Sequence, residues 1–165
     1  MSRDIDLQMQ ALQLAIERMA LLKSDNYAHT GGAVGLRSAC VRGDLGTVQR
    51  LIQQGMNIDV ELNSDGDTPL TKSIFNNQTH IALWLIDNGA DIEKALKNGR
   101  TPLITAAGCG NVQVVDALLS AGVKIDRQMN NGATALMYAI SKGLVNIAHL
   151  LVAHGASKTL KDNDG

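Results

Sequence analysis

Apolar side chains recur along this chain in short runs that fit helices of about two to three turns. In residues 112–120, Val112, Val115, Leu118 and Leu119 fall on one side of a helix with 3.6 residues per turn. Similar patterns occupy residues 79–87 and 145–153, and a shorter apolar segment precedes each run. The chain is therefore predicted to form pairs of short helices, with Thr79–Asp87, Val112–Ser120 and Val145–Ala153 as second members.

These pairs return with a fixed period. Two series of glycines are each spaced by 33 residues, Gly66, Gly99 and Gly132 in one and Gly89, Gly122 and Gly155 in the other. An earlier copy at Gly55 is displaced by 34, so one extra residue lies between Gly55 and Gly66. A period of this length is typical of helical repeat arrays.

The ends of the predicted helices have local chemical signals. Thr68 and Thr101 can accept a hydrogen bond from a free backbone N–H as N-caps, and each precedes a proline suited to the first helical position. The first helix of a pair, such as Pro102–Cys109, is expected to end at a residue that tolerates the left-handed conformation. The residues in these places are Gly43, Asn77, Gly110 and Gly143.

Together, the Thr-Pro-Leu segments 68–70 and 101–103 and the two glycine series resemble the ankyrin repeat. The resemblance covers roughly Val34 to Gly165. It implies an all-α solenoid of about four helix–turn–helix repeats joined by β-turns or hairpins, with repeats near 34–66, 67–99, 100–132 and 133–165. The family's histidine after Thr-Pro-Leu is absent here, where Arg37, Thr71, Ile104 and Met137 stand. We therefore expect turns less rigidly linked than in an idealised array.

Both ends raise a separate question. Residues 1–33 are predicted to be a capping helix and a linker, because a solenoid must cover its terminal apolar face; the alternative is a helix for dimerisation or for a partner. The last repeat also carries many apolar side chains, so either the array continues beyond it or this end meets another surface.

The resemblance implies that a partner lies against the concave face, which is built from the turn tips and the ends of the first helices. The candidate partner-binding residues are Arg42, Asp65, Asp67, Phe75, Asn76, Lys97, Arg100, Cys109, Ser141 and Lys142. Phe75 is the only phenylalanine in a chain with 2% aromatic residues, and aromatic and arginine side chains are favoured at interface hot spots. The alternative is that Phe75 tucks under the neighbouring turn.

Composition narrows the classes of function. A net charge of −1 argues against binding to nucleic acid or to a membrane surface, and no apolar run is long enough to span a bilayer. The two cysteines, Cys40 and Cys109, lack metal-ligand spacing and suit a reducing compartment, so we expect a cytoplasmic protein. Cys40 is expected in the core and Cys109 on the concave face.

Catalytic signals are missing from the pattern. The histidines are not spaced as metal ligands, and Gly108–Cys109–Gly110 lacks the Lys-Ser/Thr that follows in a phosphate loop, which makes it a predicted helix end. We expect no catalytic residues, no metal and no cofactor. The sequence predicts a module that binds another protein as adaptor, regulator or inhibitor. The alternative is self-association through the N-terminal helix or the open C-terminal face.

Overall fold

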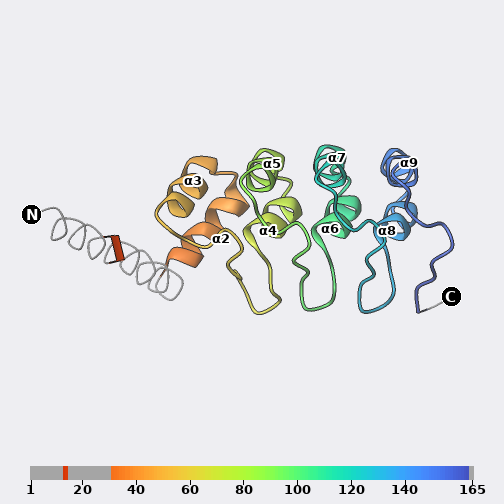
Figure 1. The fold of residues 1–165 in the computed structure, drawn as a ribbon, viewed down its shortest axis with the longest axis horizontal. Helices are drawn as coiled ribbons and strands as arrows, with labels where there is room; N and C mark the ends of the chain where they lie inside the picture. The colour runs from red at the N-terminus through yellow and green to blue at the C-terminus, as the bar shows by residue number, and fades with distance from the viewer. Residues whose placement is uncertain (1–12, 15–30, 164–165) are drawn as a thin grey trace, which may run out of the picture.

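The computed structural model describes residues 13–14 and 31–163. The described part folds into helices alone, joined in pairs (Figure 1). Their bounds are α2 Gly32–Arg42, α3 Leu45–Gln53, α4 Pro69–Phe75, α5 Thr79–Asp87, α6 Pro102–Cys109, α7 Val112–Ser120, α8 Ala135–Ser141 and α9 Val145–Ala153. The helices predicted from the apolar pattern are thus confirmed. The predicted capping helix lies outside the described residues except for Gln13 and Leu14, which are helical and exposed.

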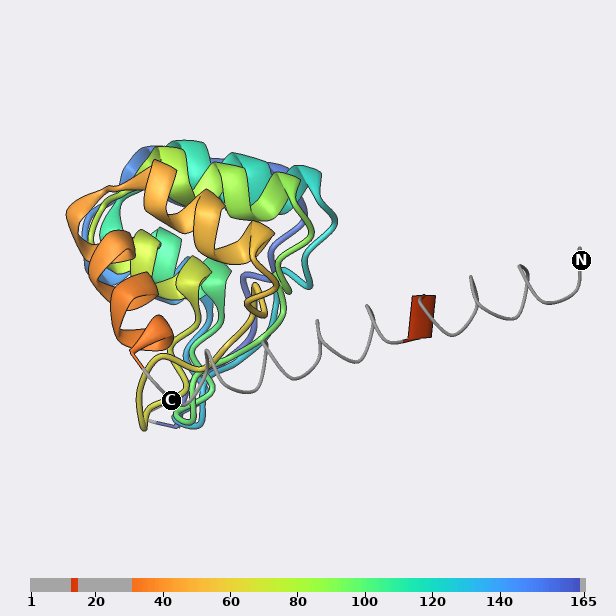
Figure 2. The same cartoon turned by 90° about the vertical axis from the view of Figure 1, so that its left-hand side faces the viewer.

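The helices form two layers. The inner helices α2, α4, α6 and α8 lie in one row and the outer helices α3, α5, α7 and α9 in another, as Figure 1 shows. Each inner helix packs on its own outer helix and on the next inner helix. Long hairpins leave the helical layers on one side (Figure 2). Because packing runs chiefly between neighbouring repeats, the array is a solenoid.

Local capping explains why the helices begin where they do. The hydroxyl oxygens of Thr68, Thr101 and Thr134 each accept a backbone N–H three residues later. Thr71 adds a second bond at the first of these caps, since its hydroxyl oxygen accepts the Thr68 N–H at 2.8 Å. Loss of such a cap costs about 1 kcal/mol, so these threonines fix the starts of α4, α6 and α8.

Two columns of buried leucines hold the layers together. One column comes from the inner helices and the other from the outer helices: Leu36, Leu70, Leu103 and Leu136, and Leu51, Leu85, Leu118 and Leu151. Cys40 is also fully buried, as predicted. Burial raises the pKa of the Cys40 thiol to about 11, which keeps the thiol neutral at ordinary pH.

The extra residue of the first hairpin lies at its tip. The backbone N–H groups of Leu62, Leu96 and Met129 donate to the carbonyls of Asp67, Arg100 and Ala133, respectively. The first of these pairs encloses one residue more than the others. Asn63 stabilises the longer turn, because its Oδ1 accepts the N–H groups of Asp65 and Asp67 at 3.1 and 2.9 Å.

Loss of the family's histidines does not leave the turns unlinked. Backbone N–H groups of Lys97, Asn130 and Asn163 donate to the carbonyls of Asp65, Asn98 and Asn131 across adjacent tips, at 2.9, 3.0 and 2.9 Å. Gly132 shows how close the tips are, since a Cβ there would lie 2.8 Å from the Asp162 Cα. The tips therefore form a continuous backbone-bonded edge, in contrast to the looser edge expected from the sequence.

The last described repeat exposes part of its core surface. Ile140 is 63% exposed, whereas Cys40, Ile74 and Ala107 are buried at the matching places in earlier repeats. Each of those three has the next inner helix packed beside it, and Ile140 has none in the part of the chain that the structure describes.

None of the helices within the described residues combines the length and the hydropathy needed to cross a bilayer.

Candidate protein-binding surface

The predicted residues at the ends of the inner helices line one face of the array. Matching or adjacent places in successive repeats hold the exposed residues Arg42, Phe75, Cys109 and Lys142. The Phe75 side chain is 39% exposed. Ser141 is exposed beside Lys142, and Asn76 is partly buried because its amide donates to the Lys72 carbonyl. We use "concave face" for these helix ends together with the hairpin arms that enter them.

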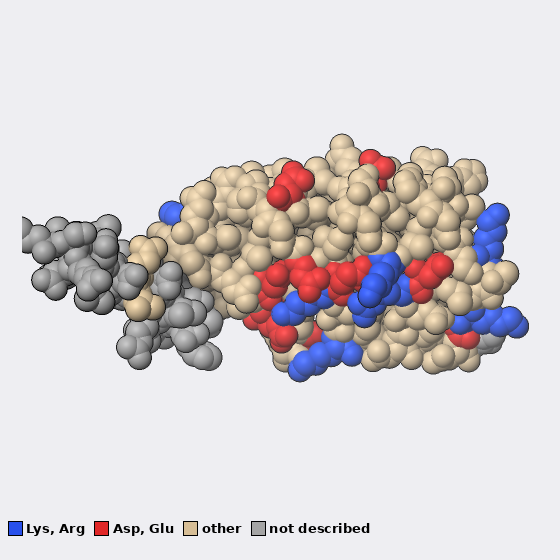
Figure 3. All heavy atoms as spheres, in the orientation of Figure 1, with Lys and Arg blue, Asp and Glu red and all other residues tan. Residues whose placement is uncertain are grey.

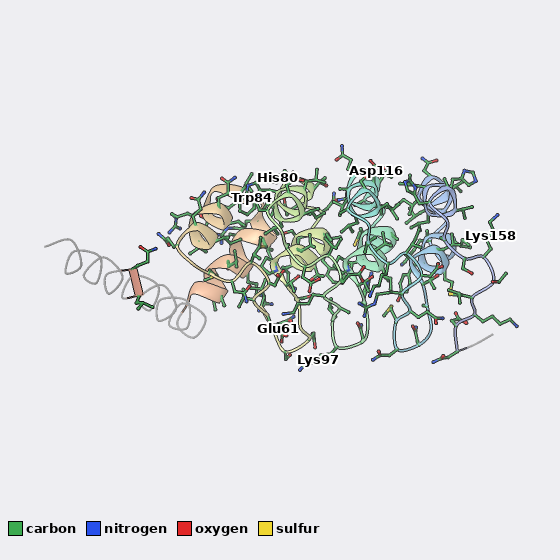
Figure 4. All side chains as sticks on the ribbon, in the orientation of Figure 1. Glu61, His80, Trp84, Lys97, Asp116 and Lys158 are labelled. Atoms are coloured by element: carbon green, nitrogen blue, oxygen red, sulfur yellow. The ribbon has the colours of Figure 1, made fainter. Side chains whose placement is uncertain are left out.

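The predicted tip residues divide into two kinds. Asp65 and Lys97 are exposed at the tips, and Figure 4 shows Lys97 at the end of its hairpin. Asp67 is only 4% exposed, which corrects its expected place on the surface. Its Oδ2 lies 2.5 Å from the Lys72 Nζ and accepts the Asn63 amide at 2.9 Å. Asp67 therefore holds the first tip onto α4.

Arg100 extends back from its tip over the inner helices. Its guanidinium carbon lies 4.8 Å from the centre of the Phe75 ring in the preceding repeat and 5.2 Å from that of Tyr138 in the following repeat. Stacking on aromatic rings is a favourable arrangement for a guanidinium, worth about 0.5–1 kcal/mol per exposed contact. Phe75 is thus partly covered by the neighbouring repeat and still exposed to solvent.

Tyr138 was not among the predicted site residues. It lies one helical turn before Ser141, in a place held by Lys72 and Thr105 in earlier repeats. The spacing to Ser141 and the scarcity of aromatic residues could have indicated it. Sequence reasoning missed the contact because Arg100 and Tyr138 belong to different repeats, and the reach of a long side chain is not encoded in the repeat period.

Gly108 provides the space for this stack. As predicted, the Gly108–Cys109–Gly110 segment ends a helix, with Gly110 in the left-handed conformation at φ 78°. A Cβ at position 108 would lie 3.0 Å from an Arg100 terminal nitrogen and 3.3 Å from the Tyr138 ring. The missing side chain of Gly108 therefore allows the guanidinium to lie against α6.

Cys109 lies beside this cluster. Its thiol is the exposed one of the two, and the positive charges of Arg100 and Lys142 both act on it. Partial burial raises the pKa of Cys109, and the two cations oppose the rise. We call Phe75, Arg100, Gly108, Tyr138 and Lys142 the arginine cluster, with Cys109 at its margin.

A second group of charges lies on the hairpin arms that leave the outer helices. Figure 3 shows acidic and basic side chains gathered there in a band across the repeats, and Figure 4 labels Glu61 at its start. Glu93 accepts the Lys124 N–H at 2.5 Å and the Arg127 guanidinium at 3.3 Å. Asp59 similarly accepts the Asp91 N–H at 2.9 Å. We call this group, Asp59, Glu61, Asp91, Glu93, Lys94, Lys124, Asp126 and Arg127, the charge ladder.

No site that meets the requirements of metal binding is found among the described residues. Residues 13–14 and 31–163 contain no group of three or more His, Cys, Asp or Glu side chains placed to hold a metal ion. Within the same residues, His80, His149 and His154 are exposed and separate, as expected from their spacing.

The fold and this surface define a helical-repeat solenoid, a class of protein that offers an extended face to partners. Two family models confirm the expected kind of repeat: ankyrin repeats (many copies) matches residues 36–86 and ankyrin repeats (3 copies) matches residues 92–162. The chain therefore belongs to the ankyrin-repeat family, whose repeats are generally protein–protein interaction modules.

A curated mouse protein is also similar to this chain. Ankyrin repeat and SAM domain-containing protein 6 of Mus musculus is 32% identical over 76 residues, which cover 46% of this chain. The match spans only 9% of the length of the mouse protein.

Proposed function

We propose that this chain binds a partner protein through its concave face and acts as an adaptor, regulator or inhibitor in the cytoplasm. The observation that carries the proposal is the arginine cluster. It places an exposed Phe75, a partly exposed Tyr138 and an arginine on one face, although these residue types are usually hidden or paired when their role is structural. The family's general role in protein interaction supports it.

The concave face has the composition of an interface core. Aromatic and arginine side chains are enriched in such cores, and the rim is polar. Here the exposed Asp65, Lys97 and Ser141 surround the cluster. Several adjacent repeats could together reach the roughly 1,200–2,000 Å² of a standard interface.

Affinity capture from the native cell lysate with mass spectrometry tests this proposal. The bait proteins are the natural chain, the double variant Phe75→Ala/Arg100→Ala, and a control variant Asp116→Ala on the exposed side of α7 (Figure 4). A partner should be retained by the natural chain and by the control and lost from the double variant, with the unfolding midpoint little changed. Equal retention by the double variant would reject the concave face as the binding surface.

A second candidate function is self-association through the C-terminal face of the described residues. Exposed Ile140 lies beside a hollow of about 290 Å³ lined mainly by apolar residues of α8, α9 and the segment after α9. Exposed apolar patches often mark interaction sites. Light scattering at high protein concentration distinguishes the two candidates: a monomer rejects self-association, and a dimer that Ile140→Glu converts to a monomer supports it.

A further inference from the structure

The Arg100 guanidinium has no acceptor of its own. Within the described residues, no oxygen accepts a hydrogen bond from this side chain, and its Nε is buried without a partner. The ion pairs among these residues include neither Arg100 nor Lys142. An arginine that contributes to a folded surface usually meets a carboxylate or a carbonyl, as Arg127 does.

We propose that Arg100 receives a side-chain carboxylate from an acidic segment of the partner protein. The proposal rests on the proposed function and names the chemistry of its partner. The Arg100 guanidinium carbon lies over the Phe75 and Tyr138 rings. The N–H donors of a guanidinium lie in its own plane, and rings that stack on it do not use them. A carboxylate can approach in the plane and accept two parallel hydrogen bonds while both rings stay in contact.

The cluster is arranged in advance for such a ligand. The two rings and the surface left open by Gly108 restrain a side chain that otherwise has many rotamers. Less conformational freedom is lost on binding when the receptor group is already ordered. Arg100 would therefore gain its hydrogen bonds at a smaller entropic cost than a freely rotating arginine.

The local charge favours an acid over a base in the partner. Lys142 lies on the same side of the cluster, since its charge and that of Arg100 both act on the Cys109 thiol. The nearest matching acid along the array, Asp67, is buried and already bonded to Lys72. Two cations on this part of the concave face thus form no ion pair within the described part of the chain, and acidic side chains would complement them.

A protein segment suits this surface better than a nucleic acid. Nucleic-acid binding relies on many cations along a backbone, and the chain has a net charge of −1 with the exposed Asp65 at a tip. Single-stranded oligonucleotide is therefore included in the experiment as the competing ligand.

The experiment uses random peptides displayed on phage, selected on the full chain and then synthesised singly. Selected peptides should be enriched in Asp and Glu and should protect Cys109 from alkylation by N-ethylmaleimide. Arg100→Ala should weaken their binding about tenfold to a hundredfold, as expected for loss of a charge-assisted pair, and Arg100→Lys should recover only part of it. In the peptide, Glu→Gln should weaken binding to the natural chain and change little with Arg100→Ala.

Gly108→Ala provides a variant that keeps every charge. The new methyl group would displace the guanidinium, while alanine is the better helix former, so peptide affinity should fall without loss of stability. Gly35→Ala, in α2, is the matched control, because its added Cβ would lie 3.9 Å from the Leu51 side chain, an ordinary van der Waals distance. It should leave affinity unchanged.

The outcomes separate this proposal from the proposed function. Peptides that protect Cys109 but bind without acidic residues, or bind Arg100→Ala equally well, would overturn the carboxylate proposal and leave concave-face binding in place. Peptides that bind without protecting Cys109 would count against both. Preferential binding of the oligonucleotide at Arg100, or a library that yields no Arg100-dependent binder, would also overturn the proposal.

Discussion

The charge ladder and the arginine cluster each contain an arginine that contacts the neighbouring repeats, but the two arginines differ in what satisfies them. In the ladder, Arg127 donates to the Glu93 carbonyl and carboxylate at 3.1 and 3.3 Å. In the cluster, the Arg100 guanidinium stacks on two rings and donates to no acceptor among the described residues. The charges of the ladder therefore join repeats, whereas the Arg100 charge has no such structural partner among the described residues and is the one that we propose receives a ligand. The difference suggests a rule for this array: a charged side chain bonded to a neighbouring repeat serves the fold, and one without such a bond is a candidate for binding a partner.

The largest effect should follow from breaking the most buried ion pair among the described residues, Asp67–Lys72. Asp67→Ala leaves the partly buried Lys72 ammonium unpaired and removes the carboxylate that accepts the Asn63 side-chain amide. The free energy of unfolding should therefore fall by about 3 kcal/mol. Urea denaturation measures this. Asp65→Ala, at an exposed site nearby, should change it by less than about 0.5 kcal/mol. Equal effects of the two would mean that Asp67 is not a structural charge.

The two thiols sharpen the contrast between buried and available groups. Because folding raises the pKa of Cys40 from 9.0 to about 11, unfolded chains lose this proton first as pH rises. The stabilisation is complete below pH 9 and should be lost between pH 9 and 11, on the order of 2 kcal/mol. Thermal unfolding across this range measures it, with Cys40→Ala as control. A Cys40→Ala variant with the same pH dependence would contradict the assignment.

Breaking the ladder should cost less. Glu93→Ala removes the acceptor of the Lys124 N–H and of the Arg127 guanidinium, and should lower the free energy of unfolding by about 1–2 kcal/mol. Glu61→Ala should cost under about 0.5 kcal/mol, because the Glu61 carboxylate is exposed and 3.6 Å from the Lys94 Nζ. Denaturant titration measures the stability of both variants. Partner affinity, measured by calorimetric titration, should be unchanged in both. If Glu93→Ala weakened binding at full stability, the ladder would belong to the binding surface.

The smallest effect concerns a helix end outside both clusters. Asn77 is the only described non-glycine residue with positive φ, at 56°, where matching helices end in Gly43, Gly110 and Gly143. Asn77→Gly should therefore change stability by only a few tenths of a kcal/mol. Glycine relieves the backbone strain, but it also gives the unfolded chain more freedom and removes the 3.5 Å contact between the Asn77 and Asn111 side chains. Asn77→Val should be clearly destabilising in the same thermal assay. Similar midpoints for the two variants would disprove the role of the left-handed backbone.

The sequence was informative wherever the signal was local. The bounds of α5, α6, α7 and α9 follow from caps, prolines and the apolar period, which act within a few residues. The candidate site was only partly predictable. The period placed Phe75 and Arg100 on one face, but it could not show that Asp67 turns inward to Lys72 or that Arg100 reaches Tyr138. Those contacts depend on the direction of long side chains and on the space left by Gly108.

Two matched arginines test the central claim most directly. The measurement is a calorimetric titration of the captured partner into the natural chain, Arg100→Ala and Arg127→Ala, with the stability of each chain recorded alongside. The account predicts that Arg100→Ala weakens binding at least about tenfold and changes stability by at most about 1–2 kcal/mol, whereas Arg127→Ala lowers stability and keeps the affinity. Equal affinity for the natural chain and Arg100→Ala, or a larger loss of affinity with Arg127→Ala, would contradict it.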